Sequence, residues 1–260
     1  MMKVNFTLLL GVGIGSAIPL VAQCPGNPIL AYHRFSDIPG GQTTITRDHL
    51  LEQWAHLESE GYRFVPLKRM EDAIDQGKPL SDHDVIVTVD DGHESVYTVL
   101  FPIIRERHIP ITLFVYPSII SNHQDALTWE QIREMQSTWL VRVESHTYWH
   151  PDFRQEKRRL PPAAYDSFVQ DQLLRSKTIL ERELRNAVHS LAWPYGIFDP
   201  RLEDFARRAG YLHAYAFDGH LASVTDDPFA IHRIPVPDSP GIGFIPCAGS
   251  RNHLSGAKGK

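Results

Sequence analysis

The sequence has few cysteines, no excess of positive charge and almost no long apolar runs. It holds two cysteines among 260 residues, and neither has the spacing of a metal-ligand pair. Lysine and arginine number 26 against 31 acidic residues, giving a net charge of −5. Because the sequence has no excess of basic residues, we expect no nucleic-acid partner. No internal repeat or long linker divides the chain, which indicates a single domain.

The N-terminus holds the main apolar run. Lys3 precedes an apolar stretch over residues 6–18 and then small residues, as in a secretion signal. The run is shorter than the roughly 20 residues that span a bilayer. We predict a signal peptide over 1–23, no other transmembrane anchor, and a secreted or periplasmic protein. Lipid attachment at Cys24 is the alternative, although Gln23 fits that motif poorly.

The two cysteines, Cys24 and Cys247, lie near opposite ends of the mature chain. In an oxidising compartment they could form one disulfide, or remain two unrelated thiols, because sequence separation does not show whether the bonding geometry is met. We predict one folded domain over residues 28–247 and a flexible tail over 248–260.

The stretch 85–92 reads Val-Ile-Val-Thr-Val-Asp-Asp-Gly, with five β-branched residues before two carboxylates. Such a run predicts a strand buried on both faces, as in a parallel sheet. Asp90 and Asp91 then fall at its carboxyl end, where α/β folds place active sites. A plain surface turn is the alternative for these residues taken alone.

Short apolar runs alternate with helical patterns along the rest of the chain, which predicts a parallel α/β sheet or barrel. Loops are expected over 34–46 and 121–127, and a surface excursion over 151–164. The predicted strands are 29–33, 62–66, 85–89, 111–116, 140–144, 191–196, 211–217 and 231–234.

Two histidines four residues apart, His146 and His150, follow a predicted strand. Imidazoles at this spacing can converge on one ion, and Asp91 from another strand end is the natural third ligand of an open site. Pro194-Tyr195-Gly196 predicts a rigid turn whose Tyr195 N–H could stabilise an oxyanion; a plain turn is the alternative.

Three motifs together resemble the polysaccharide deacetylases, the NodB-homology domain of carbohydrate esterase family four. They are Thr88-Val-Asp-Asp-Gly92, Ser145-His-Thr-Tyr-Trp-His150 and Trp193-Pro-Tyr-Gly196. Tyr32-His33 is similar to a pair seen in secreted bacterial members, including those acting on poly-N-acetylglucosamine. The resemblance implies a distorted (β/α)7 barrel, an α/β fold, with a divalent metal, most commonly Zn2+, with Co2+ or Ni2+ as alternatives.

The resemblance also implies roles for individual residues. Asp91, His146 and His150 would hold the metal, and Asp90 would be the general base. Many members place an arginine before the Pro-Tyr turn, but Trp193 stands there, so Arg233 is expected to contact the catalytic aspartate. The general acid is expected at His232, with His220 as a competitor.

We therefore predict a metal-dependent N-deacetylase of an N-acetylhexosamine polysaccharide, acting as a monomer. The predicted substrate-binding residues are Trp149, Trp193, Pro194 and Tyr195. An O-acetyl esterase of the same fold and a glycan-binding protein without turnover are the alternatives.

Overall fold

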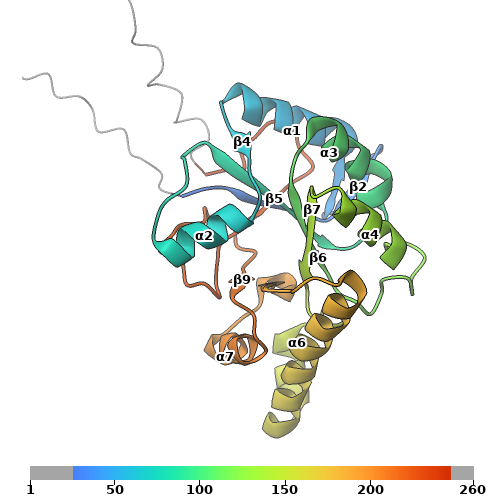
Figure 1. The fold of residues 1–260 in the computed structure, drawn as a ribbon, viewed down its shortest axis with the longest axis vertical. Helices are drawn as coiled ribbons and strands as arrows, with labels where there is room; N and C mark the ends of the chain where they lie inside the picture. The colour runs from blue at the N-terminus through green and yellow to red at the C-terminus, as the bar shows by residue number, and fades with distance from the viewer. Residues whose placement is uncertain (1–25, 247–260) are drawn as a thin grey trace, which may run out of the picture.

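The computed structural model describes residues 26–246, and an eight-stranded parallel sheet forms its centre. The strand order is β10-β1-β5-β6-β7-β8-β9, with β4 pairing to the start of β5 (Figure 1). The strands are β1 Ile29–Tyr32, β4 Arg63–Phe64, β5 Asp84–Asp91, β6 Ile111–Val115, β7 Val141–Ser145, β8 Ser190–Ala192, β9 His213–Tyr215 and β10 Ile234–Pro235.

The chain after β9 closes the sheet into a barrel. Ile231 bridges in parallel to Tyr215 at the end of β9, and β10 pairs with Leu30 and Ala31 of β1. The segment 231–235 therefore contacts both outer strands and completes the ring with β1 and β5–β9. The predicted α/β fold, a distorted (β/α)7 barrel, is confirmed.

Helices surround the barrel, and the long helix α6 extends away from it (Figure 1). Two begin with side-chain caps, since the hydroxyls of Thr46 and Thr128 accept from backbone N–H groups of the first turn. The helices are α1 Arg47–Ser59, α2 Lys68–Gln76, the π-helix η1 Val96–Leu100, α3 Phe101–Arg107, α4 Trp129–Ser137, α5 Phe153–Arg159, α6 Pro162–Leu184, the 3-10 helix η2 Pro194–Gly196 and α7 Pro200–Arg208.

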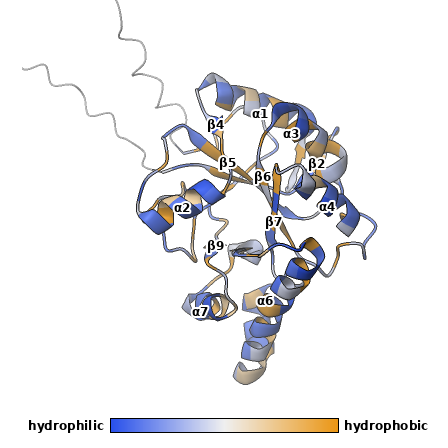
Figure 2. Ribbon diagram, in the orientation of Figure 1, coloured by the Kyte–Doolittle hydropathy of each residue, from blue (hydrophilic) through white to orange (hydrophobic). Residues whose placement is uncertain are grey.

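Strand β5 is buried on both faces, as the run of β-branched residues predicts. Val85, Val87 and Val89 belong to the larger core between sheet and helices. Ile86 belongs to a second core with Phe114 and others from neighbouring strands. Alternate side chains thus point to opposite faces, and Figure 2 shows the apolar strands beneath helices that carry many polar residues.

Two segments differ from their predicted loops. Residues 151–164 hold α5 and the start of α6, because the prolines lie before α5, between the helices and at the first position of α6, where proline does not interrupt a helix. The side chain of Asp152 accepts from Gln155 N and caps α5. Residues 34–46 contain the parallel pair β2 Arg34–Ser36 and β3 Thr44–Thr46, strands too short to give a periodic pattern.

No helix within residues 26–246 is long and apolar enough to cross a membrane. The predicted signal peptide, the tail, and both Cys24 and Cys247 lie outside the described residues.

Candidate active site

The carboxyl ends of β5 and β7 bring the predicted metal ligands together. Asp91 ends β5, and its register partner on β6, Val115, pairs in turn with Ser145 at the end of β7. His146 follows directly, so its ring lies level with Asp91. The chain then turns through residues in the left-handed conformation, including His150 with φ 63°, which brings the second imidazole back to the first.

The ligand atoms of this trio converge. Asp91 Oδ1 lies 3.7 Å from His146 Nε2 and 3.7 Å from His150 Nε2, and all three ligand atoms lie within 4.8 Å of one another. His146 Nδ1 is 2.8 Å from the carbonyl oxygen of Ala192, to which it must donate. The Nε2 lone pair of His146 is therefore free, as a metal ligand requires.

Burial sets the charges of the trio. It lowers the pKa of His146 to about 3 and also lowers the pKa of His150, so both rings stay neutral. Burial raises the pKa of Asp91, and the neighbouring Asp90 carboxylate raises it further. A divalent cation would lower the pKa of Asp91 again, because it stabilises an ionised carboxylate between neutral imidazoles.

Asp90 has the opposite environment from its neighbour. Burial opposes its ionisation, but the Arg233 guanidinium and the neighbouring histidines together outweigh burial and hold the pKa of Asp90 well below its usual range. Arg233 Nη1 and Nη2 donate to the two Asp90 oxygens at 2.7 and 2.8 Å. Such a bidentate pair fixes the carboxylate in one orientation.

Arg233 is itself held rigidly. It is fully buried, its Nε donates to the carbonyl oxygen of Ala216 at 2.9 Å, and its Nη1 also donates to Thr88 Oγ1 at 3.1 Å. The structure therefore brings Arg233 against Asp90, from the segment that closes the barrel.

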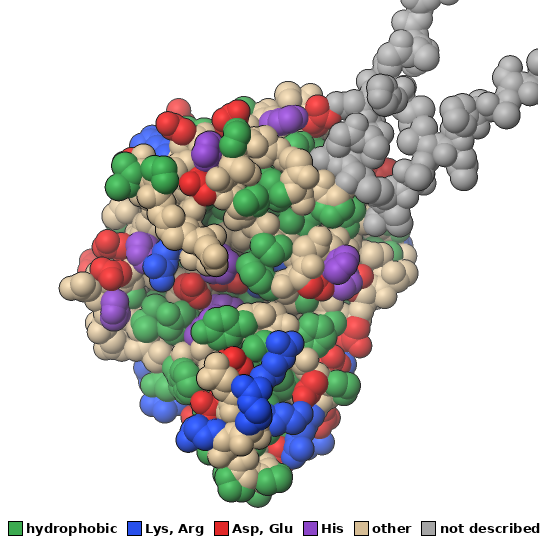
Figure 3. Space-filling model, turned by 180° about the vertical axis from the view of Figure 1, so that it is seen from behind, with side chains coloured by type: hydrophobic (Ala, Val, Ile, Leu, Met, Phe, Trp, Pro, Cys, Tyr) green, Lys and Arg blue, Asp and Glu red, His purple; other side chains and the backbone are tan. Residues whose placement is uncertain are grey.

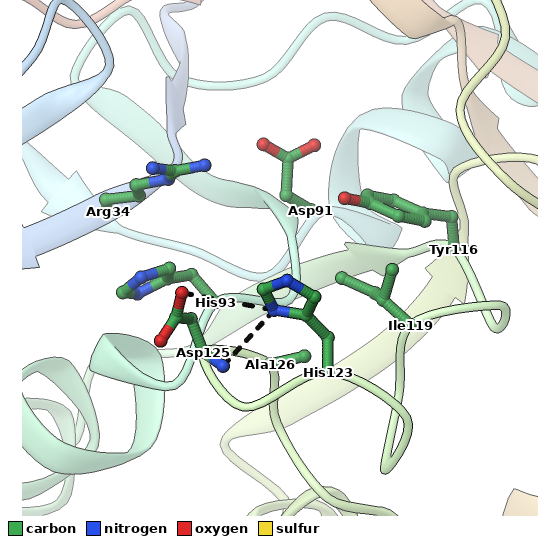
Figure 4. Close-up of a pocket in the computed structure, with 8 residues that line it drawn as sticks. All are labelled: Arg34, Asp91, His93, Tyr116, Ile119, His123, Asp125 and Ala126. Carbon is green, nitrogen blue, oxygen red and sulfur yellow. Dashed lines mark hydrogen bonds and ion pairs between the residues drawn. The ribbon is translucent and has the colours of Figure 1, made fainter.

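A cavity of about 360 Å³ opens beside Asp91 (Figure 4). Figure 4 shows Arg34 and Tyr116 on either side of Asp91, with His93, His123 and Asp125 across the cavity. Burial raises the pKa of Tyr116 to about 12, so its hydroxyl remains a hydrogen-bond donor at neutral pH. Both charge signs line the cavity, which suits a neutral polar ligand. The lining residues are Arg34, Asp91, His93, Tyr116, Ile119, His123, Asp125 and Ala126.

The predicted sugar-contacting residues separate into two groups. Tyr195 is 61% exposed, has a left-handed φ of 56°, and its ring centroid lies 4.5 Å from that of His150. Trp149 is also exposed. Trp193 and Pro194 are buried, and the Trp193 indole donates to the carbonyl oxygen of Phe229, so the prediction that these two side chains contact a sugar is wrong. Trp193 continues the strand direction of β8 and points into the core.

The histidine predicted as the general acid has another partner. The Nδ1 atom of His232 lies 2.7 Å from Asp218 Oδ2, and His232 is partly exposed, whereas its neighbour Arg233 points inward. Neither His232 nor His220 is among the main groups that shift the pKa of Asp90 or Asp91.

His33 is the site residue that the sequence analysis left without a role. Tyr32 of β1 pairs with Val89 of β5, so His33 follows beside Asp90 at the same end of the barrel. Its electrostatic interaction with Asp90 and Asp91 lowers the pKa of both carboxyls. The sequence does hold a signal for a functional role of His33. Like His146, it is the polar residue directly after a buried strand.

The sequence is similar to known proteins of one family. Residues 77–214 match the family described as polysaccharide deacetylase. The Escherichia coli K12 protein named poly-beta-1,6-N-acetyl-D-glucosamine N-deacetylase is 24% identical over an alignment of 263 residues, gaps included. The alignment covers 86% of this chain and 39% of that protein. The Staphylococcus aureus MRSA252 protein of the same name is 22% identical over 200 residues, covering 75% of this chain and 68% of that protein.

A solved structure has a similar fold over most of the chain. The structure of IcaB from Ammonifex degensii superposes with a TM-score of 0.74 at 27% identity, covering 88% of this chain and 98% of that one. The family match extends over more than half of the sequence and contains β5, β7 and both histidines of the trio. The chain therefore belongs to the polysaccharide deacetylase family.

Proposed function

We propose that the protein is a secreted or periplasmic, metal-dependent N-deacetylase that removes acetyl groups from N-acetylhexosamine residues of a polysaccharide. One observation carries the proposal: Asp91, His146 and His150 converge beside an ionised Asp90 at a cavity. The relatives named N-deacetylases support an N-acetylated polysaccharide as the substrate. We expect a monomer.

The donor set fits a divalent transition metal. Two neutral imidazoles and one carboxylate, with Nε2 of His146 and His150 directed at Asp91, are the ligands of an open catalytic zinc site. Zn2+ is the expected ion, with Co2+ or Ni2+ as alternatives. When bound, such an ion lowers the pKa of a water to about 7 and polarises a carbonyl oxygen.

Asp90 acts as the general base in this proposal. It is ionised, it adjoins Asp91 in the chain, and both of its oxygens are oriented by Arg233. As water attacks the acetyl carbon, one Asp90 oxygen takes the proton. Arg233 is a positioning residue, because it contacts Asp90 rather than the substrate.

We assign the general acid to His33 in place of His232. The amide C–N bond breaks only when the leaving nitrogen receives a proton, and His33 adjoins Asp90 across β1 and β5. A protonated His33 would donate to that nitrogen, which leaves as a free amine while acetate forms. His232 is instead engaged with Asp218.

The remaining contacts are with the acetyl group and the sugar. The Tyr195 backbone N–H, in a turn that packs on His150, is the proposed donor to the developing oxyanion. The exposed rings of Tyr195 and Trp149 are the proposed stacking surfaces for sugar rings.

The test is release of acetate and of free amine from N-acetylglucosamine oligomers in both β-1,6 and β-1,4 linkage. The protein is stripped of metal and then supplied with Zn2+ or Co2+. His146→Ala is the inactive variant, and His189→Ala, at an exposed histidine, is its matched control. We expect both products to appear in equal amounts, to require metal, and to disappear only in His146→Ala.

Two results would redirect the proposal. Acetate from O-acetylated glycans with none from N-acetylated ones would show an esterase. Metal bound at the trio and glycan retained, without either product, would show a binding protein.

A further inference from the structure

A second group of metal-ligating side chains lies outside the catalytic trio. It consists of Asp218, His220 and His232, which we call the rim cluster. Within residues 26–246, the rim cluster and the trio are the two groups of histidine, cysteine or acidic residues whose ligand atoms all lie within 4.8 Å of one another. We propose that the rim cluster binds a second divalent transition-metal ion of the zinc type.

The two imidazoles of the rim cluster flank one carboxylate. His232 Nδ1 lies 2.7 Å from Asp218 Oδ2, and His220 Nδ1 lies 3.5 Å from Asp218 Oδ1. The two rings are tilted by 55° to each other, with their centroids 5.2 Å apart. The three ligand atoms lie within 4.8 Å of one another, close enough to share one ion at zinc–ligand distances of about 2.0–2.2 Å after small adjustments.

The backbone fixes these ligands before any ion binds. The N–H groups of Asp218 and Gly219 both donate to the carbonyl oxygen of Arg233, at 3.3 and 3.0 Å. Gly219 has a φ of +83°, a conformation that other residues rarely adopt. The loop that carries Asp218 and His220 is thus tied to the segment that carries His232.

The chemistry of the donors selects the class of ion. Two imidazole nitrogens and one carboxylate suit Zn2+, Co2+, Ni2+ or Cu2+, whereas Mg2+ and Ca2+ prefer oxygen ligands. The rim cluster is more exposed than the trio, with His220 at 70% side-chain exposure, so water competes and its affinity is the lower of the two. Figure 3 shows histidine and acidic side chains gathered at several places on one face, with lysine and arginine over its lower part.

An ion in the rim cluster would affect the catalytic pocket indirectly. It would join residues 218–220 to His232, the chain neighbour of Arg233, and Arg233 orients Asp90. A bound ion would therefore stabilise the segment that closes the barrel. The rim cluster shares no residue with the trio, so zinc binding there does not depend on deacetylase activity.

The test counts zinc in full-length protein purified without a polyhistidine tag. Wild type, His220→Ala, His146→Ala and His56→Ala are dialysed against excess Zn2+ and analysed by mass spectrometry. His220→Ala removes one ligand and keeps the His232–Asp218 hydrogen bond. His56 is the matched control, an exposed histidine beside a single carboxylate, that of Glu60 at 3.8 Å.

We expect two zinc equivalents in wild type and in His56→Ala, and one in His220→Ala and in His146→Ala. The His220→Ala variant is also expected to lose the weaker phase of a calorimetric zinc titration and part of the zinc-induced rise in Tm. One equivalent in wild type, two in His220→Ala, or an equal loss in His56→Ala would each overturn the proposal.

Discussion

The barrel holds an arginine paired with buried carboxylates toward each end, yet only one end leaves ligand atoms open. Toward the carboxyl ends of the strands, Arg233 pairs with Asp90. Toward the amino ends of β7 and β8, Arg142 lies between Glu71 and Glu144, at 2.6 Å from each. The same residue types therefore occur in both regions.

The two regions differ in what surrounds the carboxylates. Glu71 also accepts from the hydroxyls of Ser190 and Tyr215, and Glu144 accepts from the backbone N–H groups of His189 and Ser190. These oxygens are saturated by protein donors, so the amino-end network contributes to stability. The trio at the carboxyl end has ligand atoms that face one another across 3.7 Å, an arrangement that an external cation completes.

Substitution of Asp90 tests the carboxyl end most severely. In Asp90→Asn the base is lost, and we expect kcat/KM to fall about 10³- to 10⁴-fold. The Arg233 charge is left without its partner, so the folded fraction is checked by circular dichroism and zinc content. A fully folded, zinc-loaded variant with near-wild-type activity would remove Asp90 from the mechanism.

Substitution of Arg142 tests the amino end. Arg142→Met leaves Glu71 and Glu144 without a counter-charge, and we expect the free energy of unfolding to fall by about 3–5 kcal/mol in a urea titration. The folded protein should keep its zinc content, because Arg142 contacts none of the trio. Loss of zinc with unchanged stability would mean that the two ends are not independent.

The pH dependence of stability provides a finer test of the amino end. Burial raises the pKa of Glu144 to about 7, against about 4.3 in an unfolded chain. The folded state therefore binds this proton more tightly, and the resulting stability is present below pH 4 and lost as the pH rises through 7. Relative to Glu144→Gln, wild type should lose up to about 3 kcal/mol between pH 4.5 and pH 8. A difference that stays constant with pH would show an ordinary pKa.

His33 gives the smallest of these effects. His33→Gln removes the proposed acid, and we expect kcat/KM to fall about 10²-fold and the basic limb of its pH profile to change. His93→Gln is the matched control, because His93 lines the cavity but bonds to Ser95. If His232→Gln shows the larger loss and the changed profile instead, the acid is His232.

The sequence determined the elements whose local signal is strong. The β-branched run before Asp90 specifies a strand buried on both faces, and the position of two carboxylates at its end follows from that strand alone. The spacing of His146 and His150 likewise places both imidazoles after one strand. Helix α5 was missed because prolines on either side of it resembled a loop.

Only the tertiary structure decided which distant residues meet. The register of β1 against β5 sets His33 beside Asp90, and closure of the barrel brings Arg233 to the same carboxylate. The tertiary structure also decided which way individual side chains point, since Trp193 points into the core and Tyr195 points outward. Strand register and barrel closure depend on packing summed over the whole core, which no short stretch of sequence contains.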